Sequence, residues 1–268
     1  MVEISVIMAV YNAGNIDVLK LAVESILKQT YTNFELIICD DCSTDGTFEI
    51  LKKFAYKDNR IILIKNEVNL KAGGTRNRCL KIAKGKFIAI MDSDDYSSPD
   101  RLEREHEFLL KNNEYAFVGS MGQYFCHFPG DMVKNYWYCA RPKKQDFLMT
   151  LPFVHASLMF RKEALQKVKG YRTLKKVIRS EDYDMLMRLY IENYVGANID
   201  KVLYYIRQDD STYKRRKYRY RLCECFVKWK GFTDMGLMPK GILYAIKPLV
   251  VGLIPVKILN WLREEYYK

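Results

Sequence analysis

Hydrophobic and polar positions alternate in blocks along the first 110 residues. Short runs of consecutive apolar, often β-branched residues predict strands that are buried on both faces. These runs cover residues 4–10, 34–40, 60–65 and 87–91. Apolar residues at helical spacing predict helices between them, over 15–30, 44–56 and 75–85. Because no hairpin signal joins the strands, the pattern predicts an α/β fold with a mostly parallel central sheet and helices on both faces.

The pattern weakens after residue 110 but still predicts structure. It indicates one or two strands in 114–128, a loop, a strand and a helix start in 151–165, a helix over 179–193 with Ser180 as N-cap, and a last strand over 201–208. We therefore expect one main domain over residues 1–212, in two halves of about 1–110 and 111–212, followed by a helical tail over 213–268.

Polar loops follow three of the predicted strands. They read "YNAGN", "CDDCSTDGT" and "MDSDD", the last with three aspartates in four positions. The carboxyl ends of parallel strands meet at one edge of the sheet, where open α/β folds bind ligands. Carboxylates this close repel one another, so the aspartates either form a solvated turn or attract a cation.

Five segments, in this order and at this spacing, resemble the inverting glycosyltransferases of family 2, which have the GT-A fold. The segments are "SVIMAVYN", "SILKQTYTNFELIICDDCSTDGT", "AGGTRNRCLKIAKGKFIAIMDSDD", "FVHASLMFRKEAL" and "SEDYDMLMRL", and the resemblance spans about residues 3–212. It implies transfer of a sugar from a nucleotide-diphosphate sugar, expected to be a UDP-sugar, to a glycan acceptor in bacterial surface polysaccharide synthesis. Residues 1–110 would bind the nucleotide and 111–212 the acceptor.

The resemblance also implies a metal site in the segment Asp92-Ser93-Asp94, which looks like the family's DxD motif. Asp94 would bind Mn²⁺ or Mg²⁺ directly, and Asp92 would contact the donor ribose or complete the metal shell beside Ser93. Such an ion prefers hard oxygen ligands and shares its shell with substrate phosphates. Asp95 would be structural. The alternative is a solvated turn before the helix near Pro99.

By the same resemblance, the nucleotide-sugar site further comprises Ala9, Tyr11, Asn12, Asp40, Asp41, Arg76 and Asn77. Asp41 would accept the imide N–H of uracil, although an Asx turn at Asp40 or Asp41 is an alternative. Arg76, at a helix start, suits a phosphate, but it also suits neutralisation of the acidic loops.

The segment Glu181-Asp182 resembles the family's ED motif. Asp182 would be the general base that takes the proton of the acceptor hydroxyl, and Glu181 would orient the acceptor. The alternative is acid residues that merely favour a helix start. His155 is expected to be a packed residue. Asp209 stands where many family members have a histidine, so it is the candidate to complete the metal shell.

The formal charge of +12 is concentrated partly in residues 213–230 and predicts an anionic partner. A nucleic-acid-binding protein using this basic tail is the alternative function, but an acidic crevice would repel a phosphate backbone, so no nucleic-acid partner is expected. The loop "YNAGN" has a single glycine and no GxxxxGK[ST] occurs, which disfavours dinucleotide-binding oxidoreductases and P-loop NTPases. Seven scattered cysteines indicate reduced thiols in a cytosolic protein.

The tail after residue 212 ends in the most apolar run of the chain, interrupted by Lys247, Pro248, Pro255 and Lys257. A bilayer span needs about 20 apolar residues, so short helices separated by prolines are expected to lie in the membrane interface, held by cations on the inner face of the cytoplasmic membrane. A polyprenyl-diphosphate-linked acceptor would suit this location. The alternative is a helix pair that packs on the catalytic domain or on a second subunit.

Overall fold

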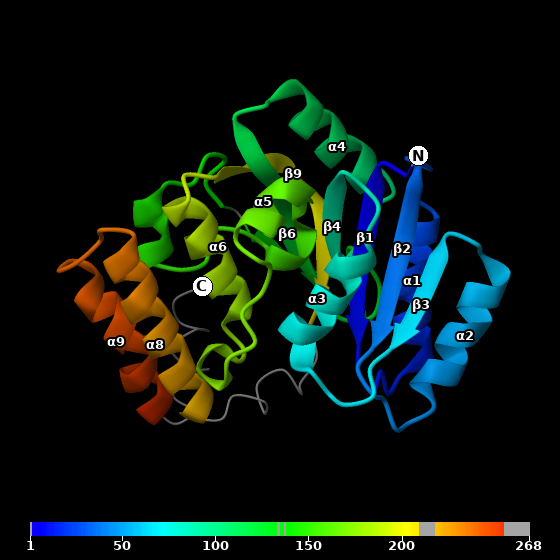
Figure 1. Ribbon diagram of the computed structural model, residues 1–268, viewed down its shortest axis with the longest axis horizontal. Coiled ribbons are helices and arrows are strands. Elements are labelled where there is room, and N and C mark those ends of the chain that lie inside the picture. The colour runs from blue at the N-terminus through cyan, green and yellow to red at the C-terminus, as the bar shows by residue number, and fades with distance from the viewer. Residues whose placement is uncertain (1, 133–134, 137, 209–217, 255–268) are drawn as a thin grey trace.

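A computed structural model describes residues 2–132, 135–136, 138–208 and 218–254. The first half forms the expected parallel sheet, in the order β3-β2-β1-β4. Its strands are β1 (Ile4–Val10), β2 (Phe34–Asp40), β3 (Ile61–Lys65) and β4 (Phe87–Asp92). The connecting helices are α1 (Ile16–Leu27), α2 (Thr47–Lys57) and α3 (Lys71–Ile82), and they lie beside this part of the sheet in Figure 1.

The sheet has helices on both faces because each strand is apolar on both faces. Alternate residues of β1 enter two separate cores: Ile7 packs in one with Cys79 of α3, and Val6 packs in the other with Leu19 of α1. Each face of the sheet therefore buries its own layer of helices, as the continuous apolar runs predicted.

The sequence predicted a mostly parallel sheet. The second half of the sheet departs from this prediction because it mixes parallel and antiparallel pairs. It continues from β4 through β8 (Met159–Arg161), β6 (Tyr115–Phe125), β9 (Val195–Arg207) and β5 (Tyr96–Ser97), with β7 (Asn135–Tyr136) on β6. The short strand β8 is antiparallel to both β4 and β6, whereas β6 and β9 are parallel. The helices of this half are α4 (Arg101–Lys111), α5 (Lys162–Lys167) and α6 (Glu181–Ile191), with 3-10 turns η1 (Lys144–Leu148), η2 (His155–Ser157) and η3 (Lys175–Val177).

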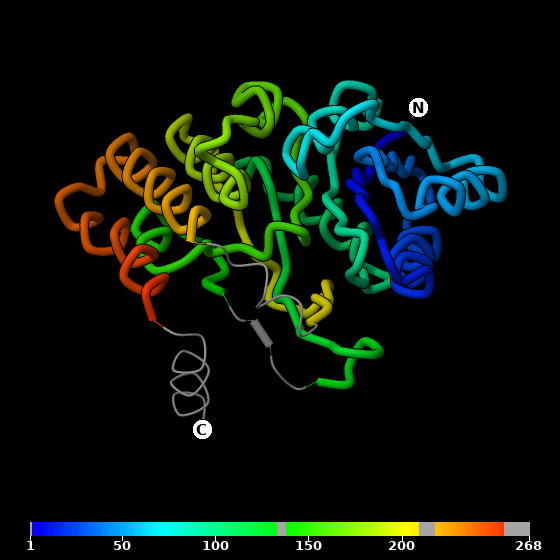
Figure 2. The backbone as a smooth tube through the Cα atoms, turned by 90° about the horizontal axis from the view of Figure 1, so that it is seen from below, coloured from blue at the N-terminus to red at the C-terminus, as the bar shows by residue number. Residues whose placement is uncertain are grey.

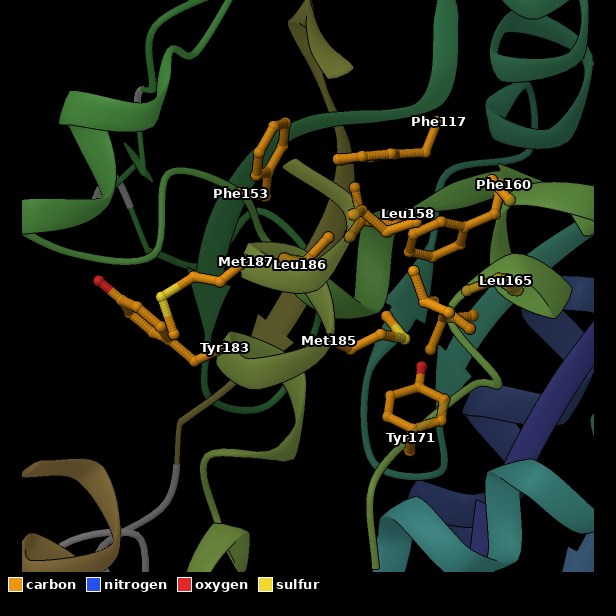
Figure 3. Close-up of a cluster of buried hydrophobic side chains, with 14 of the residues drawn as sticks. Phe117, Phe153, Leu158, Phe160, Leu165, Tyr171, Tyr183, Met185, Leu186 and Met187 are labelled. Atoms are coloured by element: carbon orange, nitrogen blue, oxygen red, sulfur yellow. The ribbon is translucent and has the colours of Figure 1, made fainter. Parts of the chain in front are cut away.

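Helix α6 anchors the core that contains Ile7 and Cys79. Figure 3 shows Met185 and Leu186 of this helix directed at the cluster that contains Phe117, Phe153 and Phe160. Because these side chains are buried, α6 has little freedom to move relative to the sheet, and its first turn is held at a defined position.

Three element boundaries differ from the sequence prediction. Helix α3 begins at Lys71, one turn before the predicted start, because the Asp41 carboxylate accepts hydrogen bonds from the N–H groups of Leu70 and Lys71 and caps it. Helix α2 begins after Gly46 instead of at Thr44 or Asp45. Strand β9 begins at Val195 because it pairs in parallel with β6, a partner that local pattern does not reveal.

The described part of the tail, residues 218–254, forms two helices, α8 (Tyr218–Asp234) and α9 (Gly241–Leu253), which lie beside α6 at the end of the molecule opposite β3 (Figures 1 and 2). Val227, Phe232 and Ala245 join the same core as Met187 of α6. The tail helices thus pack on the main domain. Helix α9 runs through Pro248, which was expected to interrupt it. Within the described residues, every helix falls short of the length and apolar character that a bilayer span requires.

Candidate active site

The carboxyl ends of β1, β2 and β4 meet at one edge of the sheet, as predicted. Ala9 is in register with Cys39 on one side and Asp92 on the other. Beyond β1, Asn12 adopts a left-handed φ of 44°, donates its N–H to Ser43 Oγ (2.9 Å) and accepts from the Thr44 N–H through Oδ1 (2.9 Å). These bonds join the loops after β1 and β2 and leave the ring of Tyr11 half exposed.

Asp40 and Asp41 are both buried at this edge but differ in their partners. Asp41 also accepts from the side-chain amide of Asn66 (2.8 Å), so it holds both the start of α3 and the loop before it. Asp40 accepts from the Ser43 N–H (3.0 Å) through one oxygen, and its other oxygen has no hydrogen-bond partner within the described part of the chain. Asp41 therefore has a structural task, and its contact with a base remains a prediction.

Arg76 forms an ion pair with Asp92, with 2.6 Å between Nη2 and Oδ1. Its guanidinium also lies over the ring of Tyr171, 5.6 Å from the centroid. Burial by itself would raise the pKa of Asp92, but the charge and hydrogen bond of Arg76, together with other nearby groups such as Arg101, hold this pKa below the usual aspartate value. Asp92 is consequently ionised, as a metal or ribose ligand must be.

The side chain of Asn77, the neighbour of Arg76, is hydrogen-bonded to the backbone of Tyr171. Its amide donates to the carbonyl of Tyr171 (2.7 Å) and accepts from the Tyr171 N–H (2.9 Å). Because both ends of the amide are used in this way, Asn77 supports the segment that carries Tyr171. A phosphate contact by Asn77 stays a prediction without geometric support.

In the loop after β4, Asp94 is exposed, Asp95 is buried and Ser93 is half-buried. Arg207 of β9 donates its N–H to Asp95 Oδ1 (2.8 Å) and its Nε to the Asp94 carbonyl (3.0 Å). Burial, reinforced by the charges of Asp94 and Asp92, raises the pKa of Asp95 well above its ordinary value. Asp95 therefore lies where a structural residue is expected, and β9 fixes the loop that presents Asp94.

Asp92 and Asp94 fit a divalent cation as a partial ligand set. Asp92 is ionised and partly accessible, Asp94 is exposed, and both offer the hard oxygens that Mg²⁺ and Mn²⁺ prefer. No group of three or more metal-binding side chains occurs in the parts of the chain that the structure describes. Two carboxylates suit an ion that takes its remaining ligands from water and substrate phosphates. Asp209, the candidate third ligand, lies outside the described residues.

Glu181 and Asp182 form the first turn of α6, and Asp182 accepts the N–H of Tyr183 (2.8 Å). Burial, reinforced by the negative charge of Glu181, raises the pKa of Asp182 to about 6. Among the described residues, one buried carboxylate oxygen of Glu181 has no hydrogen-bond partner. The charge of Arg76 acts on Asp182 as well as on Asp92, so the predicted base and the predicted metal loop both lie near one arginine.

Tyr171 is a site residue that the sequence interpretation missed. Its hydroxyl hydrogen-bonds His155 Nε2 (2.9 Å), and both side chains are buried. Burial and the nearby charge of Arg76 lower the pKa of His155 to about 3, so the imidazole is neutral. His155 is thus a packed, hydrogen-bonded histidine. The only local signal for Tyr171 is an aromatic residue directly after Gly170, which has a left-handed φ of 62°.

The fold and this edge of the sheet define a glycosyltransferase of the GT-A class, and sequence comparison gives its family. Residues 5–169 match the family model described as glycosyl transferase family 2, and the chain belongs to that family. It is 35% identical over 272 residues to EpsE of Bacillus subtilis, which is classed with the glycosyltransferases, covering 96% of this chain and 92% of EpsE. It is 49% identical over 106 residues to WfaP of Escherichia coli, covering 40% of this chain and 41% of WfaP.

Solved structures share the fold. TarS of Staphylococcus aureus, in complex with UDP-GlcNAc, superposes with a TM-score of 0.64 at 21% identity, over 94% of this chain and 71% of the other. The mannosyltransferase PcManGT of Pyrobaculum calidifontis, in complex with GDP-Man and Mn²⁺, gives a TM-score of 0.64 at 16% identity, over 99% of this chain and 79% of the other. These likenesses confirm the GT-A fold predicted from the sequence.

Proposed function

We propose that the enzyme transfers a sugar, with inversion, from a UDP-sugar to a glycan acceptor in bacterial surface polysaccharide synthesis, and that it depends on Mn²⁺ or Mg²⁺. The observation that carries this proposal is the placement of Asp92, Arg76 and Asp182 around one site. Support for the donor comes from TarS, whose structure contains UDP-GlcNAc, and support for the metal from PcManGT with Mn²⁺.

Asp94 and Asp92 would hold the cation, which, when bound, offsets the negative charge that develops on the departing diphosphate. Asp182 accepts the proton of the acceptor hydroxyl, and its raised pKa makes it a stronger base than an ordinary aspartate while it is still ionised at neutral pH. Tyr11, half exposed beside the loop after β2, offers a ring face to the base. Arg76 keeps Asp92 ionised.

The acceptor proposed is a polyprenyl-diphosphate-linked glycan. The relative WfaP is named as a β-1,3-glucosyltransferase that acts on α-D-GlcNAc-diphosphoundecaprenol. Such an acceptor is confined to a membrane, so the enzyme would act at the inner membrane surface. Helix α8 suits this location because Leu222, Phe226 and Trp229, at helical spacing on one side, are each at least 40% exposed.

The test is a screen of nucleotide sugars for thermal stabilisation with and without Mn²⁺, because a ligand that binds the folded state stabilises it by mass action. We expect a UDP-sugar to raise Tm only when Mn²⁺ is present, and Asp94→Ala to remove the Mn²⁺-dependent part. Asp17→Ala, which removes an exposed carboxylate in the first turn of α1, is the control. Stabilisation of the wild type that is equal with EDTA and with Mn²⁺ would contradict the metal dependence.

A further inference from the structure

A hollow adjoins the predicted base, Asp182. It has a volume of about 440 Å³ and is lined by Asp182, by Arg179 just before α6, and by Arg221, Lys228 and Lys247 of the tail helices. We call it the basic pocket. Figure 1 shows why the tail reaches it: α8 and α9 lie beside α6, beyond the sheet. The family model ends at residue 169, so all of these residues lie outside the matched segment.

The basic pocket contains more positive than negative charge. Among the residues that the structure describes, its charged lining residues are four cations and two acids, Asp182 and Glu224. Glu224 serves two of the cations at once, with 3.1 Å to Arg221 and 3.1 Å to Lys228. With both acids ionised, two positive charges remain in excess, which predicts an anionic ligand.

Lys228 supports the prediction of an anionic ligand because its side chain is only 7% exposed. Lysine is almost never this buried unless it is paired. Its Nζ lies 5.5 Å from the ring centroid of Tyr183, and it shares the carboxylate of Glu224 with Arg221. A cation that has been removed from water and shares one carboxylate gains most from a further anion.

We propose that the basic pocket binds the diphosphate of the acceptor while the acceptor hydroxyl faces Asp182; this rests on the proposed function. In a sugar diphosphate, the hydroxyl and the diphosphate are one sugar ring apart, and Asp182 stands at the boundary of the pocket. The diphosphate carries about two negative charges, which match the excess. The enzyme then binds its two diphosphates in different ways. The acidic donor loop needs a metal ion to bind the donor diphosphate, and the basic pocket binds the acceptor diphosphate with its own cations.

The test measures binding of farnesyl diphosphate in EDTA, where the acidic donor loop has no cation to hold a diphosphate. Lys247→Gln is compared with Lys240→Gln, which removes the same charge from the exposed start of the same helix, outside the pocket. We expect Lys247→Gln to weaken binding about five- to tenfold and Lys240→Gln to leave it unchanged. Asp182→Asn should bind at least as tightly as the wild type because it removes a negative charge from the pocket.

Vesicles of phosphatidylcholine, with and without phosphatidylglycerol, separate the acceptor diphosphate from general attraction to lipid. If both lysine variants lose the same affinity for farnesyl diphosphate and for anionic vesicles, the pocket is not specific and the proposal is wrong. Absence of farnesyl diphosphate binding by the wild type would also overturn it. Either result would leave the proposed function standing as long as a UDP-sugar still stabilises the enzyme in Mn²⁺.

Discussion

The guanidinium of Arg76 lies 2.6 Å from the carboxylate of Asp92 and keeps it ionised where burial would protonate it. Arg76→Gln should therefore raise the pKa of Asp92, and donor affinity in Mn²⁺ should fall as the pH is lowered from about 8 to about 5. The wild type should lose less affinity over the same range. Titration calorimetry with a UDP-sugar measures this difference.

Arg78→Gln is the matched control for that prediction, because Arg78 is exposed on the same helix two residues further along. Its pH dependence should follow the wild type. If Arg76→Gln follows the wild type as well, the ion pair has no part in donor binding.

The pH dependence of transfer should report Asp182. A general base works only when it is deprotonated, so kcat/KM should rise with pH and level off above about 6, the pKa to which burial and Glu181 raise this carboxyl. Asp182→Asn should lower kcat by about 10²–10⁴-fold. Glu181→Gln removes a negative charge that raises the pKa of Asp182, so the rising limb should move to lower pH. A limb that moves to higher pH would contradict the assignment.

Substitution of Asp182 by asparagine should stabilise the fold although it lowers activity. Because the folded-state pKa is raised, folding favours the protonated form, and the cost of ionisation grows as the pH rises through about 6. Asp182→Asn should therefore raise Tm by about 2–4 °C above pH 7 and by less near pH 4, where the wild-type carboxyl is protonated. Thermal unfolding at the two pH values measures the difference, and equal shifts at both would argue against the raised pKa.

Tyr171→Phe should destabilise the fold by about 1–3 kcal/mol, because it leaves the buried Nε2 of His155 without its partner. Urea unfolding measures the loss. The double variant His155→Phe/Tyr171→Phe should lose less than the sum of the two single variants, since the interaction can be removed only once. Additive losses would mean that the hydrogen bond contributes no coupling.

Membrane association should depend on the exposed side of α8. Leu222→Ser with Trp229→Ser should weaken binding to anionic vesicles about tenfold or more, because both side chains are exposed and apolar. Val68→Ser with Leu110→Ser, which alters exposed residues outside the tail helices, is the control. Removing the whole tail is a poorer test, since Val227 and Phe232 belong to the core. Equal vesicle binding by both double variants and the wild type would rule out this surface.

The sequence by itself determined the strand and helix order of the first half, because each of those elements is set by local periodicity. It also placed Asp92, Asp94, Glu181 and Asp182 at the ends of elements, where the structure has them. Boundaries failed where a distant residue decides them. Helix α3 illustrates this, because its start at Lys71 is capped by the carboxylate of Asp41 in the loop after β2.

Only the tertiary structure decided which of these residues contact one another. Three examples are the ion pair of Arg76 with Asp92, the hydrogen bond of Asn77 to the Tyr171 backbone, and the pocket that the tail completes beside Asp182. Each depends on contacts between different segments of the chain. Local patterning specifies which face of an element is apolar. Which partner meets that face, and which charge is buried against which, follows from the packing of the whole core.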